Sequence, residues 1–141
     1  MKERTAAASW KGTLKEGEGK IKLGSGLLET DYSFKSRFRE GKGTNPEELI
    51  GAAHAGCYSM ALANLLEKEG FPPEDISTKA KVNLDLIEGH HKITGIKLFT
   101  EALVPEIDEE TFQSQANLAK ENCPVSQALA STEISLEAKL K

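Results

Sequence analysis

The chain has 141 residues and a formal net charge of −4 at pH 7. This is the length of one domain, and a domain of this size can bury a core without disulfide bonds. Lysines and acidic residues are interspersed along the sequence and form no basic stripe that could neutralise phosphates. We therefore expect no nucleic-acid partner.

Targeting and membrane segments are not expected either. The first residues, Met1–Ala6, contain no apolar run long enough for a signal peptide. Two cysteines are too few for a secreted disulfide scaffold, so the predicted compartment is a reducing cytoplasm. No stretch approaches the apolar length of a membrane span, so we expect no membrane partner. The longest predicted helix even contains ionisable residues, among them Glu47, Glu48, His54 and Glu67.

Three short segments with β character come first along the chain. They are Thr5–Trp10, Gly19–Leu23 and Asp31–Phe38, and glycines separate them. This arrangement predicts a three-stranded antiparallel meander.

The next element is a long helix with a strong start signal. Asn45 is suited to the N-cap and Pro46 to the first helical position, and Glu48 lies three residues after the cap. The helix is predicted to run to Glu69 and to stop at Gly70. At about 1.5 Å per residue it is roughly 35 Å long, as long as a small domain is wide.

Apolar residues lie almost all round this helix, which indicates a central position in the fold. Small residues dominate its middle third, so another backbone can approach closely there. A tight dimer and a crowded monomer core both fit this pattern.

Two long alternating segments follow, Ser77–Ile87 and Lys92–Val104, and predict a β-hairpin. Residues 88–91 are expected to form its turn. We interpret His90 and His91 as polar turn residues, because a metal site there would lack a third ligand.

The last part of the chain is predicted to be mostly helical. Asp108 is suited to cap a helix that runs through Lys120. After a break at residues 122–124, a short helix over Val125–Ala130 and a final strand over Thr132–Leu140 are expected. Strands interrupted by two helices, with antiparallel connections, indicate an α+β fold in a single domain over residues 1–141.

The chain's only two cysteines, Cys57 and Cys123, lie in settings that suit thiol chemistry. The reactive form of a cysteine is the thiolate, which a helix N-terminus or a nearby cation stabilises. Cys123 precedes Pro124 and fits a helix N-terminus, whereas Cys57 lies about 15 Å inside its helix, where the dipole effect has faded. As a nucleophile, Cys57 therefore needs a cation from elsewhere. The alternatives are a buried small apolar residue for Cys57 and a plain loop residue for Cys123.

Two motifs carry a resemblance to a known family. The first runs from Thr44 to Leu62 and reads TNPEELIGAAHAGCYSMAL, and the second is the CPVSQ run from Cys123 to Gln127. In this order they resemble the OsmC/Ohr family of thiol-dependent hydroperoxide reductases, and most closely its OsmC branch of osmotically inducible proteins. The resemblance spans nearly the whole chain, from Trp10 to the final strand.

The resemblance implies a set of catalytic residues. The peroxidatic cysteine of the family matches Cys57, and its resolving cysteine matches Cys123. Its arginine matches Arg37, which would stabilise the thiolate and orient the peroxide, and its glutamate matches Glu47, which would hold the guanidinium. We prefer Arg37 to Arg39 on its position in the predicted strand.

The resemblance also implies a fold, partners and cofactors. Antiparallel sheets are expected to pack around the long central helix and a second helix in an intertwined homodimer with active sites at the interface. The substrate would be an organic hydroperoxide, and an external dithiol, with a lipoyl-type dithiol as one candidate, would reduce the disulfide. No metal, flavin or haem would be required.

Helix geometry adds one constraint to these roles. Glu47 and Cys57 are about ten residues apart on one helix, hence roughly 15 Å apart along its axis, and cannot touch. If the family role of Glu47 holds, they share a site only across two subunits.

Substrate preference and the role of His54 follow from residue character. The apolar surroundings expected for Cys57, with Met60, Ala61 and either Phe38 or Tyr58 nearby, favour organic hydroperoxides over hydrogen peroxide. His54 lies one turn before Cys57 and can reach it. A histidine on a buried helix face is more often simply hydrogen-bonded, so we give it no catalytic role.

A redox sensor and a non-enzymatic dimeric binding protein are the alternatives to a peroxidase.

Overall fold

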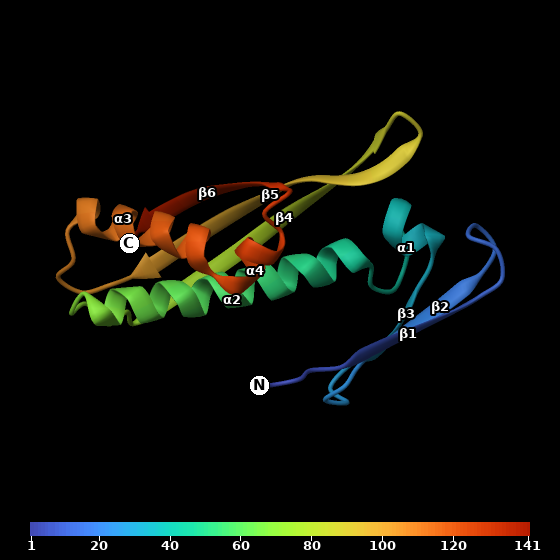
Figure 1. Ribbon diagram of the computed structural model, residues 1–141, viewed down its shortest axis with the longest axis horizontal. Helices are drawn as coiled ribbons and strands as arrows, with labels where there is room; N and C mark the ends of the chain where they lie inside the picture. Colours follow the sequence, from blue (N-terminus) through green and yellow to red (C-terminus); the bar gives the residue numbers. More distant parts are fainter. The chain divides into compact units, whose positions relative to one another are not determined.

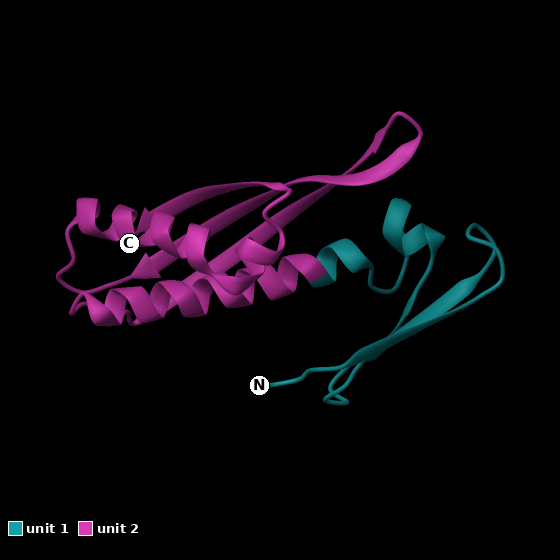
Figure 2. Cartoon of the chain, in the orientation of Figure 1, with its two compact units in different colours: residues 1–49 teal, residues 50–141 magenta.

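The computed structural model describes residues 1–141, which form two compact units (Figure 2). Unit 1 comprises residues 1–49 and unit 2 comprises residues 50–141. The chain contains six strands and four helices in segregated runs (Figure 1), which confirms the predicted α+β fold. The single domain over residues 1–141 stays a prediction.

Unit 1 is built on a three-stranded antiparallel sheet. Strands β1 (Ala6–Lys11), β2 (Glu18–Leu23) and β3 (Glu29–Tyr32) lie in the order β1-β2-β3. The predicted meander is therefore confirmed, with boundaries within two residues for the first two strands.

An aromatic pair fixes the centre of this sheet. The rings of Trp10 and Tyr32 meet edge to face with their centroids 5.3 Å apart. Gly19 lies between them on β2, where a Cβ atom would come within 2.5 Å of a carbon of each ring. Only glycine lets the two rings close over the middle strand.

The third predicted strand ends earlier than expected. Residues Phe34–Phe38 form a short helix, α1, so the prediction of a strand through Phe38 was wrong. Ser33 is the N-cap: its side chain accepts from the Ser36 N–H, and the Ser36 hydroxyl accepts from the Ser33 N–H. This reciprocal capping satisfies two backbone donors and turns the chain into a helix.

Helix α2 (Pro46–Lys68) begins in unit 1 and continues in unit 2. The Glu48 N–H donates to the Asn45 side chain at 2.8 Å, so the predicted N-cap is confirmed. At the other end Gly70 adopts a φ of +90°, as expected of the glycine that terminates a helix.

Helix α2 is also the one helix that is long and apolar enough to cross a membrane by length and composition. The expectation that no stretch approaches this length was therefore too strong. Core helices of soluble proteins pass the same test, and α2 supplies three core residues of unit 2: Tyr58, Leu62 and Leu66. The absence of a membrane partner stays a prediction.

Unit 2 contains a second sheet, in the order β4-β5-β6. Strands β4 (Asp75–Ile87) and β5 (His90–Leu103) form the predicted hairpin. Its turn is shorter than expected, because Glu88 and Gly89, both with positive φ, suffice to reverse the chain. The interpretation of His90 and His91 as turn residues was wrong, since both pair in β5.

Two helices connect β5 to the last strand. Helix α3 (Glu109–Asn122) is capped by Asp108, whose side chain accepts from the Thr111 N–H, as predicted. Helix α4 (Pro124–Ala128) follows after one residue, and β6 (Glu133–Leu140) completes the sheet. The expectation of antiparallel pairing fails here alone, because these helices return the chain to the same end and β6 runs parallel to β5.

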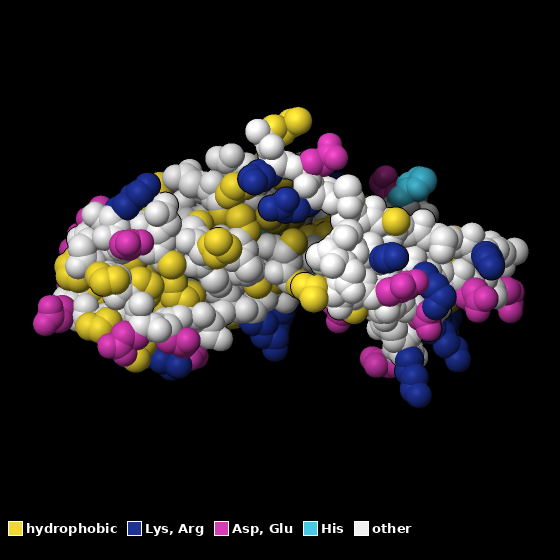
Figure 3. Space-filling view, turned by 90° about the horizontal axis from the view of Figure 1, so that it is seen from below, with side chains coloured by type: hydrophobic (Ala, Val, Ile, Leu, Met, Phe, Trp, Pro, Cys, Tyr) yellow, Lys and Arg dark blue, Asp and Glu magenta, His cyan; other side chains and the backbone are white.

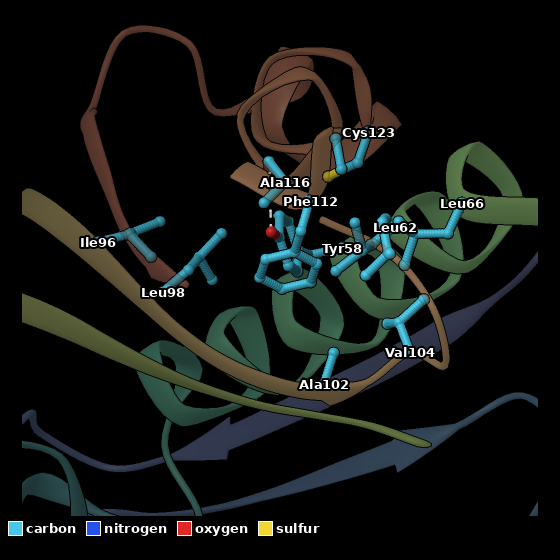
Figure 4. Packing of buried hydrophobic residues seen from close by; sticks show 12 residues of the cluster. Tyr58, Leu62, Leu66, Ile96, Leu98, Ala102, Val104, Phe112, Ala116 and Cys123 are labelled. Carbon is cyan, nitrogen blue, oxygen red and sulfur yellow. Dashed lines mark hydrogen bonds between the residues drawn. The ribbon is translucent and has the colours of Figure 1, made fainter. Parts of the chain in front are cut away.

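The core of unit 2 lies between its sheet and helices α2 and α3 (Figure 4). It contains side chains of α2, β5 and α3. Tyr58 points to its centre and donates its hydroxyl hydrogen to the Ala116 carbonyl at 3.1 Å. The remaining apolar members include Leu62, Leu66, Ile96, Leu98, Ala102, Val104 and Phe112.

Other elements of unit 2 leave the opposite face of α2 uncovered. Ala52, Ala53 and Gly56 are exposed, and Met60 is 77% exposed. Hydrophobic side chains accordingly reach the surface of unit 2 (Figure 3). Helix α2 is thus covered on one side only, not on all sides as its apolar pattern suggested.

Truncating Leu62, which is fully buried, should destabilise the fold. Leu62→Ala is expected to lower the free energy of unfolding by about 2–5 kcal/mol, because it leaves a cavity in the core. Urea denaturation followed by far-UV circular dichroism measures this loss. The control is Leu27→Ala, which removes the same atoms from a side chain 88% exposed and should change stability by less than about 0.5 kcal/mol. Equal losses in the two variants would contradict the packing described for α2.

Candidate functional site

The two cysteines lie side by side in unit 2. Cys57 is half-buried in the middle of α2, and Cys123 is buried between α3 and α4; both are free thiols. They line one open pocket of about 420 Å³. The rest of its lining is largely apolar and comprises Met60, Ala61, Asn64, Leu65, Asn122 and Pro124.

Local sequence explains the position of Cys123. Pro124 occupies the first turn of α4, and Cys123 is both the C-cap of α3 and the N-cap of α4. Its sulfur accepts a hydrogen bond from the Ser126 N–H at 3.3 Å. The expected position of Cys123 at a helix start is therefore confirmed.

The surroundings of Cys57 do not activate it. Burial raises the pKa of the Cys57 thiol, and neighbouring Cys123 raises it further, while a backbone hydrogen bond at Val125 lowers it. The net direction is upward, which disfavours the thiolate. Within unit 2, Cys57 lacks the cation that its mid-helix position demands.

A buried polar chain leads away from Cys123. The Cys123 thiol donates to the Ser126 hydroxyl oxygen at 3.1 Å, and this oxygen lies 2.7 Å from Nε2 of His54. All three side chains are buried. His54 thus faces Ser126, 72 positions along the chain, rather than solvent.

His54 has one unusual feature. Its Nδ1 atom is buried and has no hydrogen-bond partner. Burial lowers the pKa of His54, which keeps the ring neutral at neutral pH. An unpaired buried polar atom costs about 1–3 kcal/mol.

Arg37 and Glu47 form a bidentate ion pair in unit 1. The Arg37 Nε–H donates to Oε1 of Glu47 at 3.0 Å, and Nη2 donates to Oε2 at 2.9 Å. Glu47 is buried in the first turn of α2, and Arg37 lies on α1. Such a fork holds the guanidinium in one orientation.

The choice of Arg37 over Arg39 needs a different reason from the one the sequence offered. Position in a strand gives no reason, because Arg37 lies on a helix and Arg39 is its C-cap, and residues two apart in a strand would share a face. Arg39 instead lies over the Phe34 ring at 5.8 Å. The contact with Glu47 distinguishes Arg37.

The structure groups the four predicted site residues into two pairs, Cys57 with Cys123 in unit 2 and Arg37 with Glu47 in unit 1. Sequence reasoning missed Ser126 and gave His54 no role. No distinctive local signal marks Ser126, because the third position after an N-cap more typically holds Glu or Gln. Residues 1–141 contain no group of three or more His, Cys, Asp or Glu side chains placed to hold a metal ion.

Comparison with known proteins gives consistent matches. The family model for OsmC-like proteins matches residues 39–139. The chain is 49% identical to Peroxiredoxin OsmC of Escherichia coli over 135 residues, which is 95% of this chain and 94% of that one. It is 31% identical to the organic hydroperoxide resistance protein OhrB of Bacillus subtilis over 124 residues, which is 86% of this chain and 89% of that one.

The crystal structure of Bacillus subtilis OhrB is also similar, with a TM-score of 0.69 and 27% identity over 97% of this chain and 98% of that one. The agreement extends to the architecture of both units, because nearly the full length of each chain is aligned. Family model, sequence identity and fold lead to one conclusion: this chain belongs to the OsmC family.

Proposed function

We propose that the chain reduces organic hydroperoxides to alcohols through a sulfenic acid on Cys57 and a disulfide between Cys57 and Cys123. The single observation that carries this proposal is that the chain's only two thiols are free and line the same pocket. Relatives named for peroxiredoxin activity and for organic hydroperoxide resistance support it. The chain is a cysteine-based peroxidase, an oxidoreductase.

The thiolate of Cys57 is the proposed nucleophile. It attacks one oxygen of the hydroperoxide, the O–O bond breaks, and the leaving alkoxide takes a proton to become the alcohol. Cys57 is now a sulfenic acid. The sulfur of Cys123 attacks it, water leaves, and an external dithiol reduces the resulting disulfide by exchange.

Arg37 is the proposed source of the cation that Cys57 lacks. A guanidinium beside the sulfur favours the thiolate and can bind the peroxide, and Glu47 fixes its orientation. Glu47 and Cys57 stand about ten residues apart on α2, so the Arg37–Glu47 pair of one chain serves Cys57 of a second chain in a homodimer. The exposed small residues of α2 would allow this close approach.

An organic rather than inorganic peroxide suits the pocket. Met60, Ala61 and Leu65 offer apolar surface beside Cys57, where an alkyl or aryl group can be buried. Tyr58 is not part of this surface, because it points into the core. Free thiols in the resting state suit a reducing cytoplasm, with a dithiol of the lipoyl type as one candidate reductant.

Replacing each cysteine separately tests the assigned roles. In the presence of dithiothreitol, Cys57→Ser should abolish peroxide consumption, because it removes the nucleophile. Cys123→Ser should retain one oxidation of Cys57, with a sulfenic acid that dimedone traps and mass spectrometry detects, and should lose the intramolecular disulfide. Loss of activity in Cys123→Ser with an inert Cys57 would reverse the assignment. Unchanged function in Cys57→Ser would favour a binding protein, and oxidation without steady turnover would favour a sensor.

Removing the guanidinium tests the proposed activation of Cys57. In a Cys123→Ser background, Arg37→Gln should raise the pKa of Cys57 by about one unit or more, because the thiolate loses its nearest cation. Alkylation by iodoacetamide as a function of pH measures this pKa, and the rate at pH 7 should fall about tenfold per unit. The matched control Arg39→Gln removes the same charge two residues away and should leave the profile in place. A shift of equal size in both variants would mean that only the overall charge matters.

Substrate size tests the apolar pocket. Turnover per unit concentration should be about tenfold or more faster with cumene hydroperoxide than with hydrogen peroxide, because burying a large apolar group contributes at least 1.4 kcal/mol. Ala61→Asp should reduce this ratio, since a charge then lies in the pocket. A clear preference of the wild type for hydrogen peroxide would argue against an organic substrate.

A further inference from the structure

Cys123 must lose a proton inside the protein. Its side chain is only 1% exposed, so bulk water has little access to the sulfur. An ordinary thiol is only a few per cent ionised at neutral pH, and the thiolate is the attacking species. A base within the fold is therefore needed when this sulfur attacks Cys57.

The neighbours of Cys123 offer one group that can accept this proton. Tyr58 cannot, because its hydroxyl donates to the Ala116 carbonyl and burial raises its pKa. Cys57 is the other reactant. His54 is neutral and 0% exposed, and it reaches the Cys123 sulfur through the single hydroxyl of Ser126.

The hydrogen bonds that link Cys123, Ser126 and His54 agree in direction. The Cys123 thiol donates to the Ser126 oxygen, so the hydroxyl hydrogen of Ser126 is left for Nε2 of His54. Nε2 can accept it when the ring proton resides on Nδ1, the atom without a partner. Thiol, hydroxyl and imidazole then form a continuous donor chain that ends on a basic nitrogen.

We propose that His54 and Ser126 form a buried proton relay for the resolving sulfur. As Cys123 attacks, its proton moves to the Ser126 oxygen while the Ser126 proton moves to Nε2 of His54. The sulfur's electron pair forms the S–S bond, and the S–O bond of the Cys57 sulfenic acid breaks. The oxygen leaves with its pair and takes a proton from solvent in the open pocket to become water, and the proton on His54 returns through Ser126 to Cys123 when the disulfide is reduced, so atoms and electrons balance.

The same atoms stabilise the ionised sulfur. With the proton on Nε2, each hydrogen bond of the chain reverses, and the Ser126 hydroxyl then donates to the sulfur. The Ser126 N–H already donates to it at 3.3 Å. The thiolate therefore receives two donors from one residue, and His54, which touches neither sulfur, accepts the proton through Ser126.

The relay assigns residues to the second half of the proposed peroxidase cycle and rests on that function for its physiological role. It can nevertheless be tested without peroxide. Dithiobis(nitrobenzoate) reacts first with the partly exposed Cys57 and releases one coloured nitrothiobenzoate. Cys123 then attacks the mixed disulfide, releases the second nitrothiobenzoate and gives up its proton to the relay. The first phase depends on reagent concentration, whereas the second does not.

Two variants should slow the second phase alone. Ser126→Ala removes the hydroxyl that links Cys123 to His54. His54→Gln keeps an amide that can hydrogen-bond to Ser126 but cannot accept a proton. In stopped-flow measurements at pH 7 each should slow the second release on the order of tenfold, with the first unchanged. The control Tyr58→Phe removes a different buried hydrogen bond next to Cys123 and should leave both phases at the wild-type rate.

Three outcomes would overturn the relay. A wild-type second phase in His54→Gln means that His54 only holds Ser126 in place, and a wild-type second phase in Ser126→Ala means that no relay exists. Equal slowing of both phases indicates a general disturbance of the fold. Failure of the peroxidase proposal looks different, because peroxide is then not consumed although the two variants still differ from the wild type in the second release.

Discussion

The position of Cys57 in the middle of α2 is the constraint on which the rest of the site depends. A mid-helix sulfur receives no help from the helix termini, and burial raises its pKa. The position nevertheless has a structural reason, because the side chains on this part of α2 form one wall of a pocket whose other wall is the α3–α4 junction. Cys57 thus lies next to the sulfur of Cys123, but its own thiol is less acidic than an ordinary cysteine.

The break between α3 and α4 places the second sulfur, that of Cys123, at a helix start. Cys123 ends α3 and starts α4, and the ring of Pro124 prevents α3 from continuing. The sulfur of Cys123 therefore lies at the junction of two helices, where it accepts from the Ser126 N–H and its thiol donates to the Ser126 hydroxyl. The two thiols thus line one pocket, but only Cys123 lies at a helix start.

Sequence reasoning succeeded where the determinants are local. Asn45, Asp108 and Gly70 mark their helix ends by side-chain chemistry that acts over three or four residues, and each was located correctly. The strands of unit 2 alternate in burial as their residues alternate in polarity, so their spans could also be predicted.

Sequence reasoning failed where the local structure depends on a distant residue or on a weak local signal. The helix α1 depends on a reciprocal Ser33–Ser36 cap, which is weaker evidence in a sequence than the β character of the residues around it. The direction of β6 depends on how two intervening helices pack, not on its own residues. The contact between His54 and Ser126 joins positions 72 apart, and neither residue type is unusual in its local sequence.

In the proposed catalytic cycle, the two halves use different electrostatic solutions. Cys57 must be ionised before substrate arrives, which requires a permanent charge, and the guanidinium of Arg37 is the proposed source because arginine stays protonated at any physiological pH. In the proposed relay, Cys123 gives up its proton only when its sulfur attacks oxidised Cys57, because a negative charge on Cys123 raises the pKa of Cys57. The proposed acceptor of that proton is the neutral His54 behind the Ser126 hydroxyl.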